Sequence, residues 1–107
     1  MSDIEELKGE VAAFCKERDW DQFHTNKELA AAIAIEAAEL QDAFLWNREA
    51  KPEKVREELA DIFIYALRMA ERNHLDVAEI IHTKLFANAL KYPVEKCRGT
   101  AKKYTDL

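Results

Sequence analysis

Two pairs of acidic residues are the groups in this sequence best suited to chemistry. Glu36 and Glu39 lie three residues apart in the stretch IAIEAAELQDAF, and Glu58 and Asp61 repeat that spacing. Side chains three residues apart share one face of a helix, so each pair forms an acidic edge beside an apolar stripe. One such pair is most often only a solvated helix face. Two matching pairs are a more specific signal.

A short connection would bring the two pairs together. Residues 47–51 are the predicted connection, and a link this short makes the flanking helices antiparallel neighbours. Four converging carboxylates repel one another, and each buried ion is costly to desolvate unless it is compensated. A divalent cation provides that compensation. Carboxylate oxygens suit Mg²⁺, with Mn²⁺ as a substitute, and Mg²⁺ often binds substrate phosphates as well.

Cationic and aromatic residues accompany the acidic pairs. Lys84, Asn88 and Lys91 recur at helical spacing beside the apolar stripe of the last predicted helix. Near a metal site they are suited to bind phosphates, although isolated lysines on such a stripe can simply extend to water. Three aromatic residues occur near the same elements: Trp20, Trp46 and Tyr65. Each could pack in the core or stack against a nucleotide base.

Four helices are predicted to position these groups, which makes the fold all-α. Apolar residues at helical spacing predict the first helix over residues of about 2–18. Thr25 with Glu28 forms a capping box, and the helix that it begins is predicted to run to about Trp46.

The other two helices have equally clear start signals. Pro52 suits the first turn of a third helix, which is predicted to run to about Asn73. Asp76 with Glu79 forms a second capping box, and the helix after it should end near Lys91, before a proline.

Length and composition fit a single helical domain. A chain of 107 residues holds one ordinary core, so residues 1–107 are predicted to form one domain with residues 92–107 as a C-terminal tail. Hydrophobic residues make up 49% and charged residues 35%, with only two glycines and two prolines. The two cysteines form no metal-binding or redox motif, and we assign them no role.

Charge and hydropathy exclude two classes of partner. The net charge of −5 argues against nucleic-acid binding, which usually needs a basic surface. No apolar stretch approaches membrane-spanning length, and the acidic start MSDIEEL is unlike a signal peptide. We therefore expect a cytoplasmic protein with no membrane partner.

Apolar residues beyond the core stripes predict self-association. On the third helix Ile64 and Leu67 face away from the stripe, and the second helix adds apolar residues on its far side: Ala31, Ala34, Ala38 and Leu45. A small protomer cannot cover helices that are apolar nearly all round. The sequence therefore predicts a homo-oligomer.

These motifs, taken in order, carry a family resemblance that spans almost the whole chain. E36-A-A-E39, E58-L-A-D61 and the run from K84 through N88 to K91-Y92-P93 resemble the MazG-like, all-α nucleoside triphosphate pyrophosphohydrolases. The segment R18-D19-W20-D21-Q22-F23-H24 and the ending K103-Y104-T105-D106-L107 resemble more closely the dCTP pyrophosphatase branch.

The resemblance implies a fold, a reaction and a role for each residue. It implies a MazG-like helical bundle, assembled as a tetramer built from two dimers. Four acidic residues would bind Mg²⁺ and serve catalysis: Glu36, Glu39, Glu58 and Asp61. Six residues would bind substrate, the first three around the base and the others at the phosphates: Trp20, Trp46, Tyr65, Lys84, Asn88 and Lys91. The family converts a (deoxy)nucleoside triphosphate to the monophosphate and pyrophosphate, often in nucleotide-pool housekeeping.

Three alternatives stay open at this point. Within the superfamily, a phosphoribosyl-ATP pyrophosphatase is the nearest enzymatic rival, and a non-enzymatic helical interaction module is a second. The third is a di-iron bundle, suggested by E-x-x-H at residues 71–74 and 79–82, but one motif ends a predicted helix and the other begins the next, so they cannot face each other. His24 is expected to form hydrogen bonds in a loop rather than to act as a base.

Overall fold

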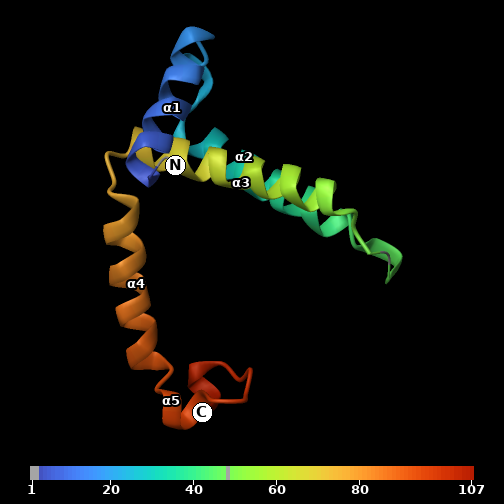
Figure 1. The fold of residues 1–107 in the computed structure, drawn as a ribbon. Coiled ribbons are helices and arrows are strands. Elements are labelled where there is room, and N and C mark those ends of the chain that lie inside the picture. Colours follow the sequence, from blue (N-terminus) through green and yellow to red (C-terminus); the bar gives the residue numbers. More distant parts are fainter. Residues whose placement is uncertain (1–2, 48) are drawn as a thin grey trace. The chain divides into compact units, whose positions relative to one another are not determined.

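The computed structural model describes residues 3–47 and 49–107, and within these ranges the ordered elements are all helical. The all-α class expected from the sequence is therefore confirmed. The chain divides into two compact units, Met1–Leu75 and Asp76–Leu107. Figure 1 shows the helices of each unit.

The first unit contains three long helices: α1 (Ile4–Glu17), α2 (Asn26–Asp42) and α3 (Pro52–Arg72). Two 3₁₀ turns interrupt the connections: η1 (Asp21–Phe23) and η2 (Leu45–Asn47). The predicted start signals are confirmed, because the Thr25 hydroxyl accepts from the Glu28 backbone N–H at 3.2 Å and Pro52 lies in the first turn of α3.

Helix α3 is the centre of this unit, because it contacts both α1 and α2. The α2 and α3 ribbons run side by side (Figure 1), which confirms the antiparallel pair expected from the short connection. Apolar burial is sparse: among the described residues, the buried apolar side chains are Cys15, Leu29 and Ala70. Phe63, on α3, is 63% exposed in the single chain.

Helix α2 ends earlier than the sequence suggested. It was expected to run to about Trp46, but it ends at Asp42, and Trp46 has a positive φ of 63° within η2. A tryptophan in this left-handed conformation cannot continue an α-helix. No glycine or proline marks the break, so nothing in the local sequence signals it.

The second unit contains α4 (Val77–Lys91), a one-turn helix α5 (Val94–Cys97) and η3 (Tyr104–Asp106). The side chain of Asp76 accepts from the Glu79 backbone N–H at 2.9 Å, which confirms the second capping signal. The region expected only as a tail thus holds a fifth helix. Tyr104 packs edge-on against Tyr92, with a centroid distance of 6.0 Å.

No helix in the described part of the chain has both the length and the apolar character needed to cross a membrane. This finding agrees with the hydropathy of the sequence.

Candidate active site

Three of the four predicted acidic ligands converge where α2 packs on α3. One carboxylate oxygen each from Glu36, Glu58 and Asp61 lies within 4.8 Å of the other two. Ligands on opposite sides of a Mg²⁺ ion lie ~4.2 Å apart, so small side-chain movements would let one ion contact all three. The i, i+3 spacing turns Glu58 and Asp61 to the same face of α3, as the sequence predicted.

These carboxylates are incompletely compensated. One oxygen of Glu36 (Oε2) and one of Glu58 (Oε2) are buried without a hydrogen-bond partner in the described part of the chain. Burial, then the hydrogen bond and the negative charge of Glu39, raise the pKa of Glu36 to about 7 from its ordinary 4.5. Buried polar atoms normally have partners, so orphaned oxygens within an acidic cluster fit a cation site.

Lys54 is the cation that contacts this cluster directly. Its Nζ lies 2.8 Å from Glu58 Oε1, one helical turn away on α3. This hydrogen bond, against the effect of burial, lowers the pKa of Glu58. Lys54 therefore keeps Glu58 ionised although the carboxylate is only 4% exposed.

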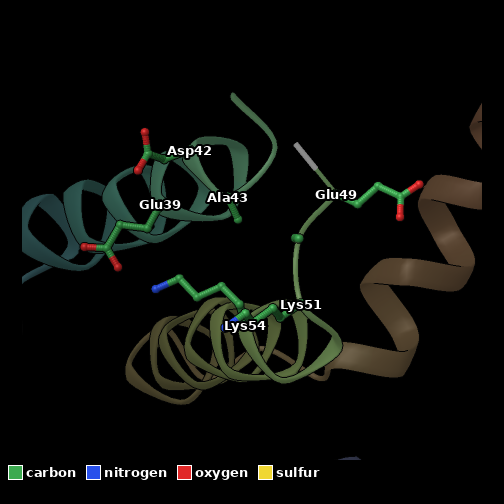
Figure 2. Close-up of a pocket in the computed structure, with 7 residues that line it drawn as sticks. Glu39, Asp42, Ala43, Glu49, Lys51 and Lys54 are labelled. Atoms are coloured by element: carbon green, nitrogen blue, oxygen red, sulfur yellow. The ribbon is translucent and has the colours of Figure 1, made fainter. Parts of the chain in front are cut away.

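Glu39, the fourth predicted ligand, lies beside the triad and lines a neighbouring cavity of about 420 Å³. The walls come from the end of α2, the connection after it and the start of α3 (Figure 2). They consist of three acidic residues, two lysines and two alanines: Glu39, Asp42, Glu49, Lys51, Lys54, Ala43 and Ala50. Charged side chains of both signs therefore line this cavity.

A second cavity, of about 190 Å³, brings two of the predicted aromatic residues to the acidic cluster. Trp20 and Tyr65 line it together with Asp61, so its wall is shared with the carboxylate triad. Burial, followed by the negative charges of Glu36 and Asp61, raises the pKa of Tyr65. The phenol is therefore neutral at pH 7. The cavity combines the aromatic side chains of Trp20 and Tyr65 with Asp61, one of the three clustered carboxylates.

Trp46 is placed differently from the other two aromatic residues. It lies on η2 with 87% of its surface exposed, and it is not among the residues lining the aromatic cavity. Its role at a nucleotide base stays a prediction.

The predicted phosphate ligands Lys84, Asn88 and Lys91 lie on α4, in the second unit. Lys84 lines a shallow cavity of about 310 Å³ on that helix, and the Lys91 ammonium lies 4.9 Å from the centroid of the Tyr104 ring. The meeting of these residues with the acidic cluster stays a prediction.

The sequence reading missed two charged residues of the site region, Lys54 and Arg68. Lys54 precedes Glu58 by four residues, an ion-pair spacing that could have revealed it. Arg68 is only 2% exposed and contacts Asp21 and His24 from the loop before α2. No helical spacing could have predicted these loop contacts. His24 does form the loop hydrogen bond that was expected of it.

The E-x-x-H residues do not form a metal cluster in the described structure. Glu71 pairs with Arg68 at 2.6 Å, and His74 has a positive φ of 55° just after α3. The only group of potential metal ligands found among the described residues is the triad of Glu36, Glu58 and Asp61.

Comparison with known proteins defines the class. Residues 31–107 match the MazG-like family. The match covers the acidic pairs, α3 and the whole second unit. The chain belongs to the MazG-like family.

Individual relatives indicate which members of the family this chain resembles. The chain is 38% identical to dCTP pyrophosphatase 1 from Rattus norvegicus and 33% identical to dCTP pyrophosphatase 1 from Homo sapiens. Both alignments cover 100% of this chain and 67% of the relative. Among solved structures, a pyrophosphatase from Archaeoglobus fulgidus DSM 4304 superimposes with a TM-score of 0.80 at 33% identity, covering 87% of this chain and 94% of that one. The family and branch expected from the sequence motifs are confirmed.

Proposed function

We propose that this protein hydrolyses deoxynucleoside triphosphates, dCTP or a close relative, to the monophosphate and pyrophosphate in a Mg²⁺-dependent reaction. The observation that carries the proposal is the convergence of Glu36, Glu58 and Asp61, with two buried oxygens unpartnered in the described structure. Membership of the MazG-like family supports the reaction class, and the relatives named dCTP pyrophosphatase 1 support the substrate. Removal of unwanted nucleotides is the physiological role that fits this activity.

The metal ligands in this proposal are Glu36, Glu39, Glu58 and Asp61. When bound, Mg²⁺ neutralises triphosphate charge and orients the phosphates for attack. The orphaned oxygens of Glu36 and Glu58 support an ion at this position rather than a purely structural cluster. Mn²⁺ has similar preferences and is expected to substitute.

The side chains around the ion have separate tasks. A glutamate of the cluster with a free oxygen accepts the proton of the attacking water, as a general base must do within hydrogen-bond reach. Trp20 and Tyr65 hold the base in the aromatic cavity, next to Asp61. Trp46, on η2, is assigned to the base as well. The α4 residues Lys84, Asn88 and Lys91 bind the phosphates that leave as pyrophosphate.

Product analysis tests the reaction. We expect dCTP incubated with protein and Mg²⁺ to give equal amounts of dCMP and pyrophosphate, the products of the proposed reaction. The chain has no G-x-x-x-x-G-K-[ST] loop of the kind that cradles phosphates in P-loop NTPases, so coupling of the hydrolysis to other work is not expected. Anion-exchange chromatography of each common triphosphate separates the outcomes. Diphosphate with orthophosphate would refute the assignment. A strict preference for phosphoribosyl-ATP would move the protein to the rival branch of the superfamily.

The proposal includes a homo-oligomer, built as a tetramer from two dimers. On α3, Phe63 is 63% and Ile64 is 43% exposed, and Leu45 on η2 is 44% exposed. Water-exposed apolar surface of this extent on a small protomer supports burial against further copies. Multi-angle light scattering at micromolar concentration is expected to give a mass of about four chains. A monomeric mass would contradict the prediction.

A further inference from the structure

Arg68 is the most deeply buried charged residue described in the first unit, with 2% of its surface exposed. Each nitrogen of its guanidinium donates to a different residue. Nη2 bonds Asp21, Nη1 bonds Glu71 at 2.6 Å, and Nε bonds His24 Nδ1 at 3.2 Å. A buried guanidinium is tolerated only when its donors are satisfied in this way.

Two of the three partners belong to one irregular loop. Asp21 and His24 lie between α1 and α2, in a segment that includes η1 and a positive φ of 56° at Asp19. Backbone hydrogen bonds shape the loop itself, such as the one from Trp20 N–H to the Cys15 carbonyl at 3.0 Å, but none of those described for it reaches α3. Its contacts with Arg68 tie it to α3, across 47 residues of sequence in the case of Asp21.

The same loop carries one wall of the aromatic cavity. Trp20 packs edge-on against Phe14 at 5.7 Å between centroids, and its ring lies 6.3 Å from that of His24. Tyr65, which also lines this cavity, lies on α3 together with Arg68, three residues away in sequence. Helix α3 therefore carries Asp61 of the carboxylate triad, the cavity residue Tyr65, and Arg68, which binds the loop that contains Trp20.

The bond from Arg68 also orients the His24 ring. Because Nε–H of Arg68 donates to Nδ1, a neutral His24 carries its proton on Nε2. Burial, and then the positive charge of Arg68, lower the pKa of His24, so the neutral form is present at pH 7. The cavity thus receives an imidazole of fixed tautomer.

We propose that Arg68 is a positioning residue for substrate, because its guanidinium ties the loop of residues 18–25 to α3 and so fixes Trp20 and His24 in the cavity that Tyr65 also lines. The proposal rests on the proposed function, since it takes the aromatic cavity to receive the nucleotide base. A buried ion pair is seldom more stabilising than apolar packing of similar volume. We therefore attribute the ion pair of Arg68 and Asp21 to the fixed geometry that it gives the loop, which fits the proposed function.

Steady-state kinetics of Asp21→Asn test the tether. The substitution weakens the ion pair on the loop side, while the carboxylates on α2 and α3 are unchanged. We expect KM for the triphosphate to rise about tenfold with kcat within about twofold, as for lost ground-state positioning. Glu71→Gln is the matched control, because it removes a carboxylate from Arg68 on its own helix and leaves both loop contacts in place. Its KM is expected to stay within about twofold of wild type.

Arg68→Lys separates geometry from charge. An ammonium keeps the positive charge but cannot reproduce the planar fork that reaches three partners. We expect Arg68→Lys to resemble Asp21→Asn. Rescue of KM to the wild-type value by lysine would overturn the proposal in favour of a simple charge effect.

A fluorescence readout makes the tether testable without turnover. The chain has two tryptophans, so Trp46→Phe leaves Trp20 as the only one. In that background Asp21→Asn should increase acrylamide quenching of Trp20, while circular dichroism stays unchanged. Wild-type quenching and wild-type KM in both Asp21→Asn and Arg68→Lys would overturn the positioning role, with the proposed function still standing on wild-type turnover. If the wild-type protein hydrolyses no triphosphate, both the proposed function and the substrate-positioning role of Arg68 are wrong. The quenching experiment would still decide whether Arg68 holds the loop.

Discussion

Two charged clusters occupy the same face of α3 and are built in opposite ways. Near the start of the helix, Glu58 and Asp61 meet Glu36 from α2, and the cation Lys54 is bonded to Glu58. Towards its end, the single cation Arg68 is surrounded by partners that use all three of its nitrogens. In the first cluster, three carboxylates outnumber the one cation, Lys54. The second has every donor nitrogen occupied.

The difference indicates which cluster binds a ligand and which one holds shape. Buried carboxylates with orphaned oxygens are unfavourable until a cation reaches them, so the first cluster gains most from binding. Each nitrogen of the Arg68 guanidinium already has a partner within the protein, so the second cluster has less to gain from a further ligand. Neutralising a carboxylate in the first cluster should therefore affect chemistry, whereas changing the second should affect geometry.

The largest expected effect comes from removing a metal ligand. Asp61→Asn and Glu39→Gln keep side-chain size but remove charge, so turnover should fall on the order of 100-fold or more while the fold stays intact. The stabilisation of Asp61→Asn by Mg²⁺ should fall too, since a ligand stabilises the native state in proportion to its affinity. Initial rates and thermal melts with and without Mg²⁺ measure both effects.

Glu57→Gln is the control for these variants, because Glu57 is an exposed neighbour of Glu58 on the same helix. It should keep wild-type turnover and wild-type Mg²⁺ stabilisation. Full activity in both Asp61→Asn and Glu39→Gln would remove the metal site from the proposal.

The two clusters also differ in how far sequence could predict them. The acidic cluster follows from helical periodicity, because two i, i+3 pairs and a short connection are visible in the chain itself. The Arg68 cluster depends on a loop that includes a left-handed Asp19 and folds back onto α3. Such tertiary contacts have no local period, so Arg68 and its partners could not be found in the same way.

The fold shows the same division. Helix starts were predicted well, because a capping side chain or a proline specifies them within a few residues. The end of α2 was predicted four residues too late, because no glycine in the sequence signals the positive φ at Trp46. Helical periodicity also does not show that Phe63, on α3, is 63% exposed in a single chain.

A second prediction concerns the pH dependence of the metal-free protein. The pKa of Glu36 is raised from 4.5 to about 7, so between these values the folded state binds more protons than the unfolded state. The contribution of Glu36 to stability is therefore fully present below pH 4.5 and is lost as pH rises through 7. Glu36→Gln carries no charge at any pH and should avoid that loss.

We expect the metal-free Glu36→Gln variant to melt a few degrees above wild type at pH 8 and at the same temperature near pH 4.5. Differential scanning fluorimetry in EDTA over this pH range measures the difference. A pH-independent difference would show that Glu36 does not titrate in this window. Adding Mg²⁺ at pH 8 should reverse the order, because wild type then gains a ligand that the variant binds less well.

The smallest expected effect sharpens the comparison at Lys54, the cation that the first cluster already has. Lys54 hydrogen-bonds Oε1 of Glu58 at 2.8 Å, so its positive charge competes with a metal ion at the neighbouring, unpartnered Oε2. Lys54→Met removes this competitor and leaves the cluster one charge more negative, so Mg²⁺ should bind a few-fold more tightly at pH 8. The gain is small because half of the Lys54 side chain is exposed, and water screens its charge. Isothermal titration with Mg²⁺ measures it, with Lys51→Met as the control, since Lys51 lines the same cavity from the start of α3. Weaker Mg²⁺ binding by Lys54→Met than by Lys51→Met would contradict this expectation and would mean that the ammonium supports the metal site by keeping Glu58 ionised. The acidic cluster would then be a compensated ion-pair network, like that of Arg68, despite its two unpartnered oxygens.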